Sequence, residues 1–341
     1  MKILIYGVGA IGGTIGGLLA KNYKDLYLLA RGENADILEI NGLTLYKKIK
    51  KTKQIIPVNI VRDLNEISNI DLIIITVKNY DLEEVTKDIK TKLENEPIIV
   101  TFQNGIENQK ILSKYFSKVV YGVISISAWR DEPGIFGYQK ERKLLIGTLD
   151  NSLREEMKII KKIIQLSIPI EITQMIQDVI HTKLLFNLTS SVLTLFDYKN
   201  HSNNTLSYVR RIITKLMIEG IEIVEAAGFK EQKIEGITSW KDIKKADNIP
   251  NKIVDTIFKK RLKKTGPNSM YQDIIINKRG VSELEFLNGY LIQLSKRYNL
   301  QSPFNNAFYK ICKKEFIKIP FKPLEPEFVW NTLNSLKSMM S

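Results

Sequence analysis

The feature that most constrains the fold is a glycine-rich turn directly behind a short apolar strand near the N-terminus. The segment ILIYGVGAIGGTIGGLLA (3–20) carries Gly7, Gly9 and Gly12 in G-x-G-x-x-G spacing and continues into a helical pattern. The first glycine permits the tight turn, the second lets the backbone approach a pyrophosphate, and the third permits close helix packing. We therefore expect a dinucleotide site here. The alternative interpretation is a tight turn with a structural role only.

The same turn supplies donors for an anion, and the next strand indicates which dinucleotide is bound. Ala10 and Ile11 lie where the helix begins, and oriented backbone N–H groups there favour phosphate. The second strand, 25–30, is followed by Arg31. An acidic residue at this place binds the ribose 2′-hydroxyl of NAD, whereas an arginine suits the 2′-phosphate of NADP. Arg31 favours NADP(H), but Glu33 nearby leaves the strictness of that preference open.

Short apolar runs alternate with amphipathic segments up to about residue 173, which indicates βαβ units. The runs 71–77 and 97–102 are continuously apolar, as in strands covered on both faces of a parallel sheet. We expect an α/β Rossmann-type N-terminal domain with a mostly parallel, doubly wound sheet. Its first strand is 3–6. Further strands, expected as an edge or an antiparallel extension, are 119–127, 143–147 and 168–173.

After residue 174 the apolar period changes to that of helices, which predicts an all-α C-terminal domain. The expected domains are 1–173 and 174–341, because 341 residues exceed what one core usually organises. Gly228 is expected to end a helix and Pro303 to open one. The basic run 47–53 is expected to be a solvated turn. The expected helices are 176–197, 204–227, 251–264, 268–278, 283–298 and 304–317.

Composition narrows the function classes. The net charge of +14 raises the question of nucleic acid, but the lysines are scattered and no nucleic-acid motif accompanies them, so a solvated surface that attracts anionic small molecules is favoured. One cysteine, Cys312, excludes an intrachain disulfide and is consistent with a reducing cytoplasm. No apolar run reaches the roughly 18 residues that a membrane span needs. Two histidines leave few ligands for a metal.

One apolar helix carries an unexpected charge. In HTKLLFNLTSSVLTLF (181–196) Lys183 is the only formally charged residue, and Asn187, Ser191 and Thr194 follow it at helical spacing. Moving a lysine ammonium from water into the protein interior costs on the order of several kcal/mol unless the charge is paired. This polar stripe is therefore expected to face solvent or a cleft between the domains.

Six motifs together resemble the ketopantoate reductase (2-dehydropantoate 2-reductase) family, in order and spacing, to about residue 318. They are GVGAIG (7–12), TVKNYD (76–81), FQNGIEN (102–108), HTKLLFN (181–187), NSMYQDI (268–274) and SELEFLNG (282–289).

The resemblance implies a role for each matching residue. Lys183 would be the catalytic general acid that protonates the carbonyl oxygen during hydride transfer, and Glu283 would accept a hydrogen bond from the far hydroxyl of the substrate. Ser269 would bind the substrate carboxylate, with a helix N-cap as its alternative. Asn104 would contact nicotinamide and substrate, and Lys78 the cofactor. Asn187 would bind substrate one turn after the lysine.

The sequence also departs from the family pattern. Ser191 stands where the family usually has a second substrate asparagine, which puts the substrate in doubt because a serine has a shorter reach. His181 stands where an aromatic residue is common, with no consequence that sequence reasoning can derive. The tail from about residue 319 extends beyond the usual end. Its spaced apolar residues predict an amphipathic helix packed on its own body or, in a homodimer, on a second subunit: Phe328, Val329, Leu333 and Leu336.

The leading hypothesis is an NADPH-dependent reductase that converts 2-dehydropantoate to pantoate for pantothenate and coenzyme A synthesis, with Lys183 as general acid. A paralogue that reduces another 2-oxo acid is the nearest alternative. A non-catalytic NADP(H)-binding protein is the alternative of another class. Nucleic acid and membrane are not expected partners.

Overall fold

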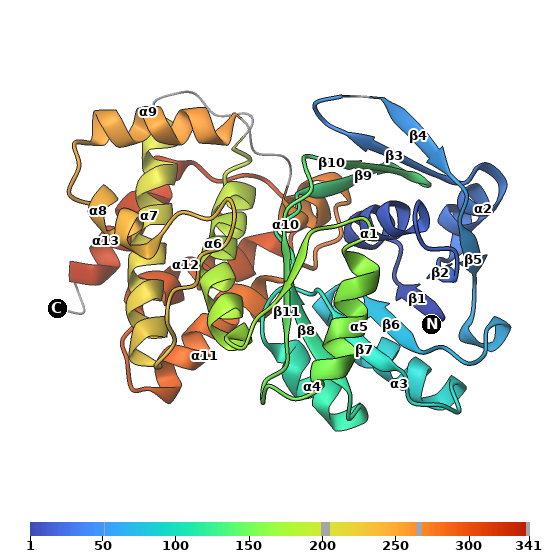
Figure 1. Cartoon of the computed structure of the whole chain (residues 1–341). Coiled ribbons are helices and arrows are strands. Elements are labelled where there is room, and N and C mark those ends of the chain that lie inside the picture. The colour runs from blue at the N-terminus through green and yellow to red at the C-terminus, as the bar shows by residue number, and fades with distance from the viewer. Residues whose placement is uncertain (51, 199–204, 264–267, 339–341) are drawn as a thin grey trace. The chain divides into compact units, whose positions relative to one another are not determined.

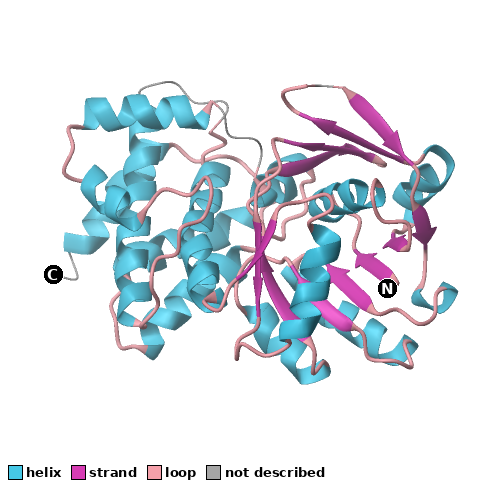
Figure 2. Ribbon diagram, in the orientation of Figure 1, coloured by secondary structure: helices cyan, strands magenta, loops and turns pink. Residues whose placement is uncertain are grey.

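The computed structural model describes residues 1–50, 52–198, 205–263 and 268–338, side chains being described up to residue 335. The chain divides into two compact units, Met1–Gln177 and Asp178–Ser341 (Figure 1). Strands gather in the first unit and helices fill the second (Figure 2). Among the described helices, none has both the length and the apolar character that crossing a bilayer requires.

An eight-stranded sheet forms the framework of the first unit, and its order is β12-β11-β8-β7-β6-β1-β2-β5. The strands from β8 to β5 are parallel to one another, whereas β11 runs antiparallel to β8 and β12 lies at the edge. The expected doubly wound fold is thus confirmed. The strands are β1 (Ile3–Tyr6), β2 (Leu26–Leu29), β5 (Asn59–Val61), β6 (Leu72–Ile75), β7 (Ile98–Thr101), β8 (Val119–Val123), β11 (Leu144–Gly147) and β12 (Ile170–Ile172).

The chain order reverses between β1 and β6, which lie side by side at the middle of the sheet. Ligands of open α/β sheets bind beside the carboxyl ends of the strands at such a point. The helices and short 3₁₀ turns of this unit are α1 (Ala10–Ala20), α2 (Gly32–Asn41), η1 (Leu64–Glu66), η2 (Asn79–Asp81), α3 (Leu82–Lys92), α4 (Glu107–Tyr115) and α5 (Arg154–Ile164).

The residues of strand β1 are apolar on both faces of the strand because both faces are covered. Ile3 and Ile5 belong to a core cluster with Ile15 and Leu19 of α1. Tyr6 points to the opposite face, where its hydroxyl meets Asp88 of α3. The tyrosine hydroxyl is therefore the one polar side-chain group of this otherwise apolar strand, and it lies at the end of the strand.

A second sheet of four strands, β4-β3-β10-β9, was not expected from the sequence. It covers α1, and the ring of Phe136 lies 2.3 Å from where a Cβ on Gly13 would stand. The expected turn 47–53 joins β3 to β4 but includes one residue of each strand, and residue 51 lies outside the described residues. The four strands are β3 (Leu43–Lys47), β4 (Lys53–Ile56), β9 (Ala128–Glu132) and β10 (Ile135–Tyr138).

The described part of the second unit is helical. Gly228 (φ +89°) follows α7 as expected and Pro303 opens α12. Helix α8 was not foreseen, and the two helices expected at 268–278 and 283–298 contain π-helical turns, η3 and η4. The elements are α6 (Ile176–Leu195), α7 (Thr205–Ala226), α8 (Trp240–Ala246), α9 (Asn251–Leu262), α10 (Ser269–Tyr271), η3 (Gln272–Ile276), η4 (Glu285–Gly289), α11 (Tyr290–Arg297), α12 (Pro303–Phe316) and α13 (Pro326–Ser338).

The C-terminal extension packs on its own unit. Helix α13 lies against α7 and α12, and the side chains of Val329 and Leu333 are buried there. The backbone N–H of Leu324 donates to the carbonyl oxygen of Leu195, the last residue of α6, at 3.1 Å. The expectation that Phe328 shares the packed face was wrong, because this residue is 66% exposed. The side chain of Leu336 lies outside the described residues.

Replacing Leu333 with Ala should lower the free energy of unfolding by about 3 kcal/mol, because a fully buried leucine loses its contacts and leaves a cavity. Phe328→Ala on the same helix is the matched control and should change it by less than about 0.5 kcal/mol. Urea denaturation followed by circular dichroism measures both. Equal effects of the two substitutions would contradict the packing of α13 on its own unit.

Candidate functional site

The turn after β1 is as tightly enclosed as the glycine spacing predicts. Gly7 has φ +101°, a value that favours glycine. A Cβ on Gly12 would lie 2.0 Å from the carbonyl oxygen of Gly7. The hydroxyl of Thr76, just after β6, donates to that same oxygen at 2.6 Å. Strand β1, helix α1 and the end of β6 are therefore in backbone contact, with no room for a side chain at residue 12.

Gly9 is different, because it faces open space. It is the N-cap of α1, and a Cβ built on it would meet no heavy atom within 4 Å. The first turn of α1, which includes Ala10 and Ile11, has no acidic residue. An anion that approaches this helix end meets backbone N–H groups and the positive end of the helix dipole. These features fit the pyrophosphate of a dinucleotide.

The loops after β6 and β7 are tied together. Asn79 donates from Nδ2 to the carbonyl oxygen of Asn104 at 2.5 Å, and Gln103 donates from Nε2 to the carbonyl oxygen of Val77 at 3.0 Å. Lys78 and Asn104 are both partly exposed. The structure thus brings these two predicted residues to the same edge of the sheet. Sequence reasoning missed the two amides that join the loops.

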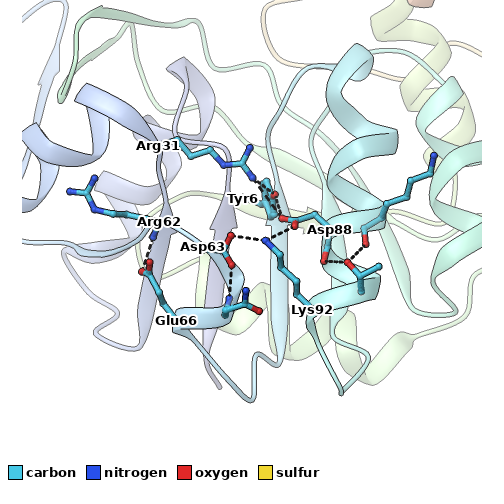
Figure 3. Close-up of polar contacts among 10 residues, drawn as sticks. Tyr6, Arg31, Arg62, Asp63, Glu66, Asp88 and Lys92 are labelled. Atoms are coloured by element: carbon cyan, nitrogen blue, oxygen red, sulfur yellow. Dashed lines mark hydrogen bonds and ion pairs between the residues drawn. The ribbon is translucent and has the colours of Figure 1, made fainter.

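Arg31 lies at the N-cap of α2, and its side chain is 58% exposed. Its Nη2 atom lies 3.1 Å from the Tyr6 hydroxyl and 3.7 Å from a carboxylate oxygen of Asp88 (Figure 3). Burial, followed by the hydrogen bond to Asp88, raises the pKa of Tyr6 well above its usual value. The phenol therefore stays protonated and donates to Asp88. Neither Tyr6 nor Asp88 was singled out by the sequence.

Of the four polar residues predicted to form a stripe on helix α6, two are partly exposed to solvent and two are buried. Lys183 and Asn187, one turn apart, are partly exposed. Ser191 is 0% exposed, and its hydroxyl donates to the carbonyl oxygen of Leu188 at 2.9 Å. Thr194 likewise donates to Ser190 at 2.7 Å. Such back-bonding satisfies a hydroxyl within the helix, so the polar stripe that the sequence shows is accessible only in its first half.

Two residues from separate motifs meet in the second unit. The hydroxyl of Ser269 donates to a carboxylate oxygen of Glu283 at 3.1 Å, and Glu283 is 3% exposed. The N-cap of α10 is Asn268, whose side chain accepts from the N–H of Tyr271 at 2.9 Å. The alternative interpretation of Ser269 as a helix N-cap was therefore wrong. Its hydroxyl points at a buried carboxylate instead.

His181 lies on the opposite side of α6 from Lys183, because two residues correspond to about 200° of helical rotation. Its ring stacks on Phe229, with centroids 3.5 Å apart, and its Nε2 lies 3.0 Å from the hydroxyl of Tyr290. The backbone N–H of Gln232 donates to the hydroxyl of Thr182, the next residue of α6, at 3.0 Å. These contacts fix the back of α6, a role that the sequence did not reveal.

A cavity of about 730 Å³ opens between the end of α7 and α8. Phe229, Trp240 and Lys244 are among its lining residues, and Lys244 pairs with Glu225 at 2.7 Å. Because Phe229 stacks on His181, this cavity lies behind α6 and away from the face of Lys183. It is separate from the predicted site residues.

Comparison with known proteins assigns both units to one family. The family model described as ketopantoate reductase PanE/ApbA matches residues 3–151, and the model of the C-terminal part of the same enzymes matches residues 175–315. The chain belongs to the ketopantoate reductase family. Ketopantoate reductases are oxidoreductases, and helix α13 lies beyond the matched residues.

Individual relatives are distant but span nearly the whole chain. The 2-dehydropantoate 2-reductase of Pyrococcus horikoshii is 27% identical over 320 residues, which cover 92% of this chain and 97% of that protein. A D-mandelate dehydrogenase solved with NADH and anilino(oxo)acetate has a TM-score of 0.75 at 18% identity, covering 98% of this chain and 100% of that chain. A ketopantoate reductase from Staphylococcus aureus, described as dimeric, has a TM-score of 0.67 at 23% identity and covers 94% and 100%.

Two glycine substitutions should separate the structural and the binding roles of the turn. Gly12→Ala should destabilise the first unit by several kcal/mol, roughly the effect of overpacking a tight contact, because its Cβ collides with backbone. Gly9→Ala should lower the melting temperature much less but weaken the binding of a nicotinamide dinucleotide, because its Cβ enters the open space at the helix end. Thermal denaturation and calorimetric titration measure the two effects. Unaltered binding by the Gly9 variant would argue against a pyrophosphate at this turn.

Proposed function

We propose that this chain is an NADPH-dependent 2-dehydropantoate 2-reductase. The observation that carries the proposal is the partly exposed lysine in the middle of apolar helix α6, with Asn187 one turn away. An ammonium held on a rigid helix is suited to stabilise a developing alkoxide and to protonate it. Membership of the ketopantoate reductase family and the names of the relatives support the same reaction.

The proposed cofactor residues come from the first unit. Gly7 and Gly12 shape the turn, while Gly9, Ala10 and Ile11 form the helix end that holds the pyrophosphate. Lys78 and Asn104 follow the central strands; Lys78 contacts the cofactor, and Asn104 contacts the nicotinamide and the substrate. A nicotinamide dinucleotide is the cofactor named for the D-mandelate dehydrogenase of the same fold.

Arg31 carries the preference for NADP(H) over NAD(H). Its guanidinium is more than half exposed at the end of β2, where a 2′-phosphate is expected, and an arginine pairs with phosphate through two parallel hydrogen bonds.

The chemistry divides between cofactor and chain. When bound, the reduced nicotinamide supplies a hydride to the C2 carbonyl carbon. Lys183 then gives a proton to the carbonyl oxygen, so that the keto group becomes the hydroxyl of pantoate. The charge of the ammonium favours this step, because negative charge develops on that oxygen in the transition state.

The proposed substrate contacts use the pair formed by Ser269 and Glu283. Ser269 binds the carboxylate of the 2-oxo acid by turning its single O–H donor from Glu283 to the substrate, and Glu283 then accepts a hydrogen bond from the far hydroxyl. The buried carboxylate supports this assignment, since it already accepts a hydrogen bond from a hydroxyl group at 3.1 Å. Asn187 adds an amide that orients the substrate.

Ser191 supports the alternative, a paralogue with another 2-oxo acid. Its hydroxyl is buried and engaged within α6, so it offers less to a substrate than an asparagine would. The likeness to a D-mandelate dehydrogenase shows that this fold also serves a different hydroxy acid. A non-catalytic NADP(H)-binding protein is the alternative that Lys183 argues against. A homodimer remains an expectation, which light scattering tests.

Lys183→Ala should lower kcat for ketopantoate reduction by about 100- to 10,000-fold, the range for loss of a general acid. The Kd for NADPH should stay within about 3-fold of the value for the unaltered enzyme, because Lys183 is proposed to act on the substrate and not to bind the cofactor. Stopped-flow and fluorescence titration measure the two quantities. Unchanged turnover would eliminate Lys183 as the proton donor.

Glu283→Gln should lower kcat/KM for ketopantoate by about 10- to 100-fold, as expected when a hydrogen bond to a charged group is lost. The same variant should reduce 2-oxoisovalerate almost as the unaltered enzyme does, because that analogue lacks the far hydroxyl. Steady-state kinetics with both acids provides the measurement. If the unaltered enzyme turns over 2-oxoisovalerate as fast as ketopantoate, the paralogue becomes the better reading.

A further inference from the structure

The surroundings of Arg31 contain a chain of polar contacts that the proposed function does not use. The carboxylate of Asp88 accepts a hydrogen bond from Tyr6 on one oxygen, at 2.5 Å, and from Lys92 on the other, at 2.9 Å. Lys92 also contacts Asp63 at 2.6 Å (Figure 3). Two cations and two anions, Arg31 included, thus alternate along one contact chain that joins the N-cap of α2, strand β1, helix α3 and the N-cap of η1.

Arg31 is held only loosely in this chain. Its hydrogen bond to the uncharged Tyr6 hydroxyl is 3.1 Å long, near the upper end of the usual N–H···O range, and its separation from Asp88 is 3.7 Å, which is longer than a hydrogen bond. Both carboxylate oxygens of Asp88 already have closer donors. The exposed guanidinium therefore keeps further N–H groups that can turn to a phosphate.

Asp88 is nevertheless a strong potential competitor. Its side chain is 17% exposed, so its charge is less screened than that of a surface carboxylate. A carboxylate and a phosphate can each accept two parallel hydrogen bonds from an arginine. The Tyr6 hydroxyl contacts both groups, because it accepts a hydrogen bond from Arg31 at 3.1 Å and donates one to Asp88 at 2.5 Å.

We propose that Asp88 sets how strongly this chain prefers a 2′-phosphorylated cofactor, because it competes with the 2′-phosphate for Arg31, and that Tyr6 limits this competition. The inference rests on the proposed function only in taking Arg31 as the 2′-phosphate contact. Asp88 and Tyr6 are specificity-determining residues that act through Arg31.

Asp88→Asn removes the competing charge and should tighten NADP⁺ binding by about 3- to 5-fold, the size of a partly exposed ion pair. Tyr6→Phe lets Asp88 close on Arg31 and should weaken NADP⁺ binding by about 3-fold or more, as for one hydrogen bond. The Kd for NAD⁺, which has no 2′-phosphate, should change by less than about 2-fold in both, since these sites couple only through Arg31.

The double variant Asp88→Asn with Tyr6→Phe tests whether Tyr6 acts through Asp88. Its Kd for NADP⁺ should lie within about 2-fold of that of Asp88→Asn alone, because no carboxylate remains for Tyr6 to restrain. Glu83→Gln, which removes an exposed carboxylate on the same helix that pairs with Lys87, is the matched control and should leave the NADP⁺ to NAD⁺ ratio unchanged. Calorimetric titration with NADP⁺, NAD⁺ and 2′,5′-ADP measures binding without turnover.

The outcomes separate this inference from the proposed function. If Arg31→Ala leaves NADP⁺ affinity unchanged, the 2′-phosphate contact fails and the inference fails with it. If Arg31→Ala weakens NADP⁺ alone but Asp88→Asn weakens it too or has no effect, the cofactor assignment stands and the competition is overturned. A full effect of Tyr6→Phe in the Asp88→Asn background would overturn the role of Tyr6. Constant NAD⁺ affinity and melting temperature exclude misfolding as the cause.

Discussion

The close approach of helix α1 to the end of β1 is the constraint on which the first unit depends. Gly12 has no space for a Cβ, because the carbonyl oxygen of Gly7 would lie 2.0 Å from it. This contact places the N-terminal end of α1 at the carboxyl edge of the parallel sheet, where the loops after β6 and β7 begin. The cofactor residues proposed here share this edge because they follow parallel strands, although they are far apart in sequence.

Strands covered on both faces were predictable from sequence, whereas several partly exposed strands were not. Strands β6 and β7 read as unbroken apolar runs because helices cover both sides. Strand β4, with the sequence KQII, is mostly exposed and looked like part of a basic turn. Strands β3 and β10 pair across about 90 residues of sequence, and no local pattern reveals such a partner. The π-helical turns were also hidden, because an inserted residue barely alters the helical period.

The candidate site shows the same division. The family resemblance predicted Lys183, Asn187, Ser269 and Glu283 as site residues, and the structure shows a contact between the last two. Spacing did not indicate that the hydroxyl of Ser191 would donate to a carbonyl oxygen of its own helix. A serine has the same place in a polar stripe whether its hydroxyl bonds to the helix or to another partner. Tyr6 was read as one more apolar strand residue. Its hydroxyl gains meaning only from Asp88, a partner on another element.

The covering of α1 by the second sheet affects how the chain matures. Helix α1 is complete by residue 20, but Phe136, which seals its outer face, leaves the ribosome more than a hundred residues later. At elongation speeds of about 5–20 residues per second, this delay is on the order of ten seconds. The face of the glycine-rich helix that Phe136 covers therefore has no cover from the second sheet until β10 has been synthesised.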